Sequence, residues 1–154
     1  MPITQTQTSH APTGPRGFAA SDEPVVIDFV AGLPGFPASR QFVVEDLGAH
    51  VQPFCRIRSL AEPAIAFTVA PPGLLFPDYS VEIDEDHVVQ LGLNSAEDVV
   101  TLVIVTIPQA PQPPTANLLG PIVINRTTRS AAQIVQHQSS YGVAERFGEP
   151  RSAG

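Results

Sequence analysis

One cysteine and four histidines are the residues of this 154-residue chain best suited to nucleophilic or metal chemistry. His50 precedes Cys55 by five residues, so a Cys–His nucleophilic pair is one hypothesis. The run Cys55-Arg56-Ile57-Arg58 instead places Cys55 on the apolar face of a strand, where cysteine most often acts as a small hydrophobic residue. We favour that interpretation. The histidines are far apart in the sequence, which predicts no zinc site (His10, His50, His87 and His137).

Three further motifs invite chemistry, and none of them completes a site. Asp84-Glu85-Asp86-His87 is rich in carboxylates but lacks the alternating ligands and the glycine of a calcium loop. Gly32-Leu33-Pro34-Gly35-Phe36 contains no lysine and precedes no helix, so it predicts a tight turn rather than a phosphate-binding loop. Ser139, Ser140 and Tyr141 have no neighbour that would activate a hydroxyl. We therefore interpret the chain as a non-enzyme without cofactor or metal ion.

Short segments of alternating apolar and polar residues, separated by turns rich in Gly and Pro, predict an all-β fold. We expect about eight short strands, at residues 25–30, 41–45, 54–59, 65–69, 79–83, 99–107, 122–126 and 133–136. The segment 99–107 is apolar on both faces, which predicts a central strand. Because such short strands must bury their apolar faces by packing or by closing, the sequence predicts a small antiparallel β-barrel or sandwich.

One or two short helical turns are expected between these strands. Asp84 can cap the first turn, with Glu85 and Asp86 near its positive end and Gly92 available to terminate it. Ser95-Ala96-Glu97-Asp98 has the spacing of a capping box and predicts the second.

Acidic residues dominate the middle of the chain. The net charge is −7, and no Lys or Arg occurs between Arg58 and Arg126. That acidic stretch contains Glu62, Asp78, Glu82, Asp84, Glu85, Asp86, Glu97 and Asp98. The negative electrostatic field of such a stretch repels nucleic acid and speeds the association of basic partners. A net negative charge can also do no more than keep a protein soluble. We therefore expect no direct binding to DNA or RNA.

Length and composition predict one domain. Hydrophobic residues make up 43% of the 154 residues, enough for one hydrophobic core. Residues 1–22 are rich in Thr, Gln, Ser and Pro and predict a disordered arm, residues 23–147 the β-barrel domain, and residues 148–154 a flexible tail. The arm has no apolar run typical of a signal peptide, and the longest apolar run is too short to span a bilayer. We expect a cytoplasmic protein with no membrane contact.

Five residues remain without a role in this survey: Phe76, Asp78, Tyr79, Thr115 and Asn117. Core packing explains the aromatic residues, and a turn explains Asn117, as readily as binding does. Their segments belong to an ordered set that resembles the FliW family, bacterial flagellar assembly factors, over about 120 residues. The resemblance rests on Val30-Ala31-Gly32-Leu33-Pro34-Gly35-Phe36, Ser59 to Phe67, Leu75-Phe76-Pro77-Asp78-Tyr79, Val103 to Pro108, Thr115 to Asn125 and Gln133-Ile134-Val135.

The resemblance implies a regulator that binds other proteins. FliW family members bind CsrA, a basic dimeric RNA-binding protein, and relieve its repression of flagellin translation. They also bind flagellin, which competes for them and closes a feedback loop. We therefore expect CsrA and flagellin as partners of a chain that is monomeric when free. The predicted partner-binding residues are Phe76, Asp78, Tyr79, Glu82, Asp84, Glu85, Asp86, Thr115 and Asn117.

Two alternatives belong to other functional classes. A β-barrel could bind a small ligand in its interior, although a barrel this small usually fills that interior with side chains. A hydrolase built around Cys55 would need a reactive thiolate at neutral pH. Slow thiol labelling of the native protein would contradict the hydrolase.

Overall fold

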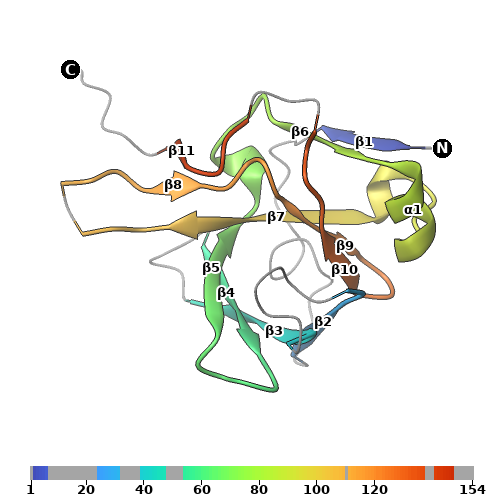
Figure 1. Ribbon diagram of the computed structural model, residues 1–154, viewed down its shortest axis with the longest axis horizontal. Coiled ribbons are helices and arrows are strands. Elements are labelled where there is room, and N and C mark those ends of the chain that lie inside the picture. The colour runs from blue at the N-terminus through green and yellow to red at the C-terminus, as the bar shows by residue number, and fades with distance from the viewer. Residues whose placement is uncertain are drawn as a thin grey trace.

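Seven strands close into a barrel in the computed structural model, which describes residues 2–6, 24–31, 39–47, 54–109, 111–137 and 141–147. Their order around the barrel is β7, β5, β4, β3, β2, β10 and β9, and β9 closes it by pairing with β7 (Figure 1). The bounds are β2 Val25–Phe29, β3 Gln41–Asp46, β4 Cys55–Ser59, β5 Ala66–Ala70, β7 Val99–Thr106, β9 Ile122–Asn125 and β10 Ser130–Gln133. The predicted all-β barrel is thereby confirmed.

Alternate residues of these strands fill the barrel with apolar side chains. Phe29 and Phe42 are fully buried there and pack edge to face, with ring centroids 5.4 Å apart. Cys55 is also fully buried and belongs to the same interior cluster as Ile57, as the alternation predicts. This position is that of a packing residue rather than of an accessible nucleophile.

Strand β7 has two buried faces, as predicted. Val100 and Leu102 point into the barrel interior, whereas Val99, Val103 and Val105 belong to a second cluster outside it. Because successive side chains of a strand point to opposite faces, an uninterrupted apolar run requires a covering layer on each side.

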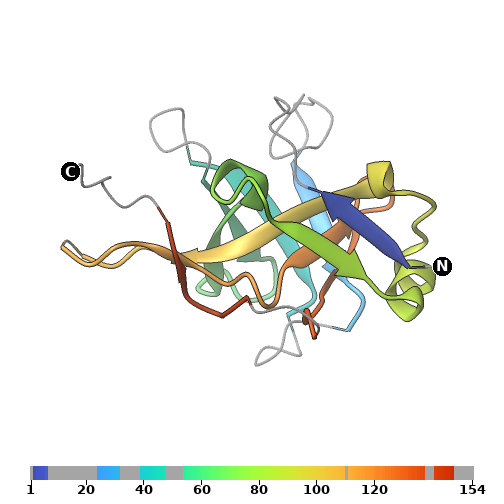
Figure 2. The same cartoon turned by 90° about the horizontal axis from the view of Figure 1, so that it is seen from above.

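The outer layer consists of a second, two-stranded sheet and the helix α1. Strand β1 (Ile3–Thr6) pairs antiparallel with β6 (Ser80–Ile83), and α1 (Glu85–Leu91) follows β6 directly. Figures 1 and 2 show the two strands side by side across the outside of β7, with α1 at one end. The buried side chains of this layer include Val81, Ile83, Val88 and Leu91.

Strand β1 corrects the predicted disordered arm, residues 1–22, at residues 3–6. Ile3 packs against the outer cluster. The Gln5 amide donates from Nε2 to the carbonyl oxygens of Val99 (2.7 Å) and Ala96 (3.3 Å), and its Oε1 accepts from Thr101 Oγ1. These long-range hydrogen bonds hold a polar segment against the barrel. The composition of the segment does not reveal that such bonds form. The rest of the predicted arm, residues 7–23, and the predicted tail, residues 148–154, lie outside the described residues.

Both predicted helical turns are present. Asp84 caps α1 by accepting the backbone N–H of His87 at 2.9 Å, and Gly92 ends the helix in the left-handed conformation with φ of 68°. The second turn is the 3₁₀ helix η4 (Ala96–Asp98), where the Asp98 carboxylate accepts the N–H groups of Asn94 and Ser95. No helix in the described ranges is long and apolar enough to cross a membrane.

Three short elements and one pairing differ from the sequence-based prediction. The structure adds the 3₁₀ helix η3 (Pro72–Leu74) and the two-residue strands β8 (Thr115–Ala116) and β11 (Glu145–Arg146). The last barrel strand, β10, ends at Gln133, so most of the predicted strand 133–136 follows it. Strand β10 also pairs in parallel with β2, whereas all pairings were expected to be antiparallel. Closing the barrel brings these distant strands together in that orientation.

Candidate protein-binding surface

The nine predicted binding residues fall into two groups by the elements that carry them, and Figure 1 labels these elements. One group lies just before β6, in β8 or just after β8: Phe76, Asp78, Tyr79, Thr115 and Asn117. The other group lies on β6 and the start of α1: Glu82, Asp84, Glu85 and Asp86.

Tyr79 is a buried member of the first group. Its side chain is 1% exposed, its hydroxyl donates to the carbonyl oxygen of Leu118 at 2.7 Å, and its ring packs edge to face on Tyr141 at 4.6 Å. Burial, with a smaller effect of Tyr141, raises the pKa of the Tyr79 hydroxyl well above its ordinary value. Tyr79 therefore stays a neutral hydrogen-bond donor that holds two segments together, and it can support a binding surface but cannot touch a partner.

Asn117 and Thr115 also organise the backbone of this region. Asn117 Oδ1 accepts the N–H groups of Leu119 (3.1 Å) and Gly120 (2.9 Å), so the side chain closes the turn after β8. Thr115 lies in β8 with Thr106 and Arg146 opposite it on the two neighbouring strands. Both side chains are half-buried.

Replacing Asn117 with alanine is expected to lower the free energy of unfolding by about 1–2 kcal/mol, because two turn N–H groups lose their acceptor. Asn117→Asp keeps an acceptor oxygen in the same place, now in a carboxylate, and should remain near wild type. Urea unfolding of both variants checks this, and equal losses would show that the acceptor is not what matters.

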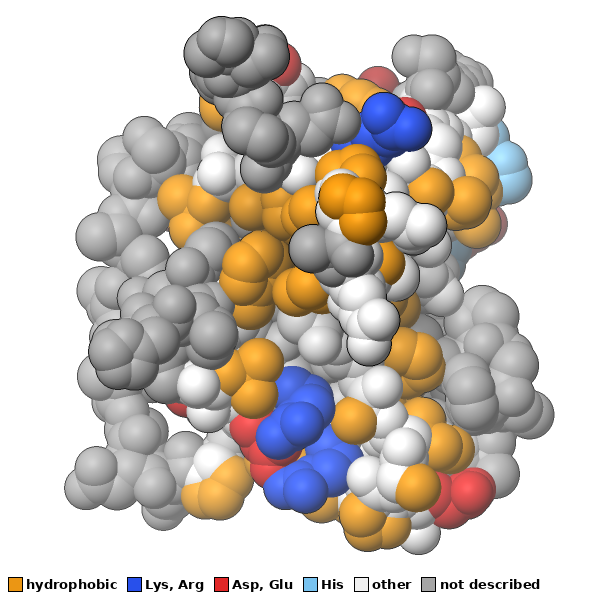
Figure 3. Space-filling view, turned by 90° about the vertical axis from the view of Figure 1, so that its left-hand side faces the viewer, with side chains coloured by type: hydrophobic (Ala, Val, Ile, Leu, Met, Phe, Trp, Pro, Cys, Tyr) orange, Lys and Arg blue, Asp and Glu red, His pale blue; other side chains and the backbone are white. Residues whose placement is uncertain are grey.

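Phe76 lies beside Phe147, which directly follows β11 at the end of the molecule that carries β8 and β11 (Figure 1). The half-buried Phe76 ring packs edge to face on Phe147 at 6.0 Å, and Phe147 in turn contacts Phe54 at 6.0 Å. Asp78 is exposed. Figure 3 shows hydrophobic side chains gathered across the middle of this end, with arginines and acidic side chains below them. These two residues are therefore partly or fully accessible to another protein.

Three residues of the second group line one side of a surface hollow of about 660 Å³. Glu82, Asp84 and Glu85 line it from β6 and α1, and Val135, Gln136 and His137 line it from the segment that follows β10. The three carboxylate residues are exposed. Asp86 is exposed as well but is not among the lining residues. The structure thus brings three of the four predicted acids together at one hollow.

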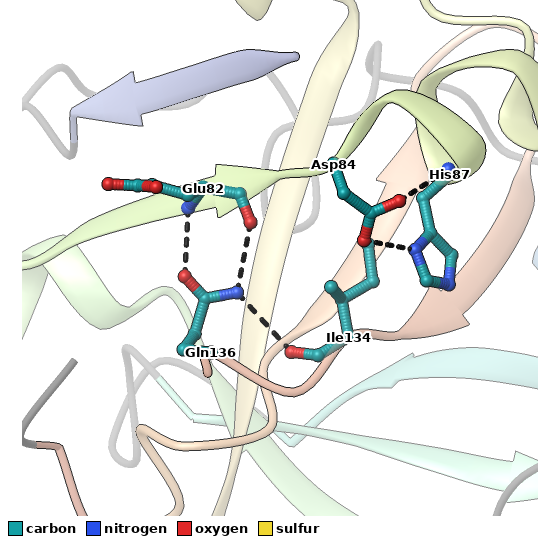
Figure 4. Close-up of polar contacts among 5 residues, drawn as sticks. All are labelled: Glu82, Asp84, His87, Ile134 and Gln136. Atoms are coloured by element: carbon teal, nitrogen blue, oxygen red, sulfur yellow. Dashed lines mark hydrogen bonds and ion pairs between the residues drawn. The ribbon is translucent and has the colours of Figure 1, made fainter. Parts of the chain in front are cut away.

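Gln136 joins the two walls of this hollow, and sequence reasoning did not assign it a role. Its side chain is buried at 6% exposure, its Oε1 accepts the N–H of Glu82 at 2.8 Å, and its Nε2 donates to the carbonyl oxygens of Glu82 (3.0 Å) and Ile134 (3.4 Å) (Figure 4). One signal was available, because alternation in 133–136 puts Gln136 on the same face as apolar Ile134. A polar residue on a buried face has to be hydrogen-bonded.

Asp84 is held by His87, from the first turn of α1. The carboxylate accepts the His87 N–H at 2.9 Å and lies 2.7 Å from His87 Nδ1 (Figure 4). Partial burial alone would raise the pKa of Asp84, but the backbone and side-chain hydrogen bonds from His87, with its charge, outweigh burial and lower that pKa.

This pKa shift makes a prediction for acid unfolding. A carboxyl whose pKa is lower in the folded state stabilises the fold above its unfolded pKa, and that contribution disappears as the pH falls through the folded pKa. Asp84→Asn should keep the cap but lose this part of the pH dependence below about pH 4, whereas Asp84→Ala should lose about 1 kcal/mol at neutral pH as well. Thermal melting as a function of pH measures both effects.

The chemistry considered for metal ions has no support in the described residues. Across residues 2–6, 24–31, 39–47, 54–109, 111–137 and 141–147, no group of three or more His, Cys, Asp or Glu side chains could hold a metal ion. The residues named in the sequence analysis that lie outside the described residues are His10, the predicted turn at 32–36, Ser139, Ser140 and His50, which was considered as a partner for Cys55 but not favoured.

The fold and surface define a class: a small closed β-barrel protein whose interior is packed with side chains and whose outer layer carries a group of exposed acidic side chains. The model of the FliW protein family matches residues 12–147. Flagellar assembly factor FliW of Bacillus licheniformis is 40% identical over 126 residues, which are 82% of this chain and 87% of that protein. The Bacillus subtilis protein of the same name is 36% identical over 119 residues, 77% and 82% of the two chains.

A solved structure supports the same assignment. The crystal structure of the flagellar assembly factor FliW superposes with a TM-score of 0.75 at 34% sequence identity, covering 80% of this chain and 86% of that one. The chain belongs to the FliW family.

Proposed function

We propose that this protein is a flagellar assembly factor that binds CsrA, antagonises its repression of flagellin mRNA translation, and is itself bound by flagellin. Family membership carries the first part, because the relatives at 36–40% identity bear that name. The regulatory part applies to this chain what the family resemblance implies. On this proposal the protein acts in the cytoplasm, where translation occurs, and is a monomer until it binds a partner.

The charge of the exposed residues supports CsrA as a partner. Glu82, Asp84, Glu85 and Asp86 are consecutive or nearly so and all exposed, on β6 and α1. A basic RNA-binding protein approaching this surface gains from long-range attraction, which chiefly raises the association rate. RNA itself is repelled by the same field.

Competition between the two partners supplies the feedback. Flagellin that accumulates before export binds this protein, so less of this protein is free to bind CsrA. CsrA then represses flagellin translation again. This scheme requires only that binding of one partner lowers the affinity for the other, and such coupling is reciprocal.

A cell-free translation assay tests the proposal. A reporter behind the flagellin leader is repressed with purified CsrA, and adding this protein should restore translation in proportion to its concentration. Excess flagellin should then re-establish repression. A reporter that stays repressed at a large molar excess of this protein over CsrA would contradict the proposed function.

A further inference from the structure

The hollow beside β6 has a mixed lining that selects among ligands. We call it the acidic groove, and its described lining residues are Pro2, Ser80, Glu82, Ile83, Asp84, Glu85, Val135, Gln136, His137 and Tyr141. Three of these are carboxylate residues, one is a histidine, and none is an arginine. Such a lining favours a cationic ligand over an anionic or neutral one.

The groove also offers apolar contact. Val135 is 48% exposed although it is a large hydrophobic residue, and the half-buried Tyr141 also belongs to the lining. An arginine suits such a surface, since its aliphatic stem packs on apolar side chains while its guanidinium binds carboxylates with two parallel hydrogen bonds.

The hydrogen bonding of β6 decides how a partner can be held. One edge of β6 pairs with β1, in the register Thr4 opposite Glu82. On the other edge, the Gln136 amide already meets both the N–H and the carbonyl oxygen of Glu82. Because both edges are occupied at this residue, a partner cannot add a strand to β6 there. It has to bind across the outer face, through side chains.

We infer that the acidic groove is the docking site for an arginine-bearing segment of the protein partner, held by side-chain contacts with Glu82 and Glu85 and by packing on Val135. The inference rests on the proposed function, since it assigns to this groove the capture of basic CsrA. It goes further by separating the groove from the rest of the acidic stretch and by excluding strand addition.

Matched pairs of charge substitutions test the inference. The double variant Glu82→Gln/Glu85→Gln removes two charges from the groove, and Glu62→Gln/Glu97→Gln removes two from exposed residues of the same acidic stretch that do not line it. Calorimetry with CsrA at low salt should give about tenfold or greater weakening for the groove variant and less than about threefold for the control. Val135→Ser should weaken binding severalfold without changing its salt dependence.

The outcomes distinguish the inference from the function beneath it. Equal weakening by the two double variants would show that the acidic stretch attracts CsrA as a whole, and it would overturn the docking site in the groove. Unchanged binding of a groove variant that melts at the wild-type temperature would overturn it as well. In both cases wild-type binding to CsrA would still support the proposed function. Absence of wild-type binding would overturn both.

Discussion

Replacing Tyr79 with alanine is expected to lower the free energy of unfolding by about 3–5 kcal/mol. The side chain is almost wholly buried in the outer cluster, where it contacts Tyr141 and donates to Leu118. Its removal leaves a cavity and an unpaired carbonyl oxygen between β6 and the segment after β8. Chemical denaturation monitored by circular dichroism measures the loss directly.

The matched variant Tyr79→Phe separates the contribution of the buried ring from that of the hydroxyl hydrogen bond. Phenylalanine keeps the ring contact and removes only the hydroxyl, so the loss should fall to about 1–2 kcal/mol. Partner binding by Tyr79→Phe, measured well below its melting temperature, should match wild type because the buried ring touches no partner. A folded Tyr79→Phe that no longer binds would contradict the supporting role assigned to this residue.

Gln136→Leu is expected to lower the free energy of unfolding by about 2–4 kcal/mol. Leucine fills much of the same volume but leaves the N–H and carbonyl oxygen of Glu82 without the amide that now meets both. The effect should be local as well, with faster amide hydrogen exchange in β6 and the first turn of α1 than in the barrel strands.

A conservative variant controls for volume in this experiment. Gln136→Glu keeps an acceptor for the Glu82 N–H, but its carboxylate cannot donate to the Glu82 carbonyl oxygen. Protonation restores an O–H donor, so the stability deficit of this variant should shrink as the pH falls towards 4. A Gln136→Leu variant as stable as wild type would show that the backbone of β6 needs no partner on that edge.

Local signals in the sequence predicted the elements that depend on local chemistry. The cap at Asp84, the terminating Gly92 and the capping box before β7 are formed as expected, because each involves residues within a few positions of one another. The two-sided β7 was likewise predicted from its apolar run, since burial of both faces leaves a direct mark on residue type.

Pairing between strands that are distant in the sequence could not be predicted from local residue patterns. Strand β1 lies in a polar segment and is held by β6 and by the Gln5 amide, which bonds to residues more than 90 positions away. The parallel contact of β10 with β2 follows from closure of the barrel and has no signature in either strand. Composition correctly marks such segments as polar but does not show that distant backbone groups bind them.

The candidate site likewise has features that the sequence showed and features that only folding produced. The charges of Glu82, Asp84 and Glu85 were visible in the sequence, whereas the opposite wall at Val135 and His137 became part of the groove only through folding. For Tyr79 and Asn117, the packing and turn explanations that competed with binding describe what their side chains do. Phe76 and Asp78 retain accessible surface, so their predicted partner contacts remain to be tested.

Titration of the purified protein with purified CsrA tests the central claim most directly, namely that this barrel exists to bind a basic regulator. The account predicts saturable binding at low ionic strength that weakens progressively as salt is added, because exposed carboxylates contribute to it. Two proteins that neither exchange heat nor co-elute, even at the lowest ionic strength at which both stay folded, would contradict it.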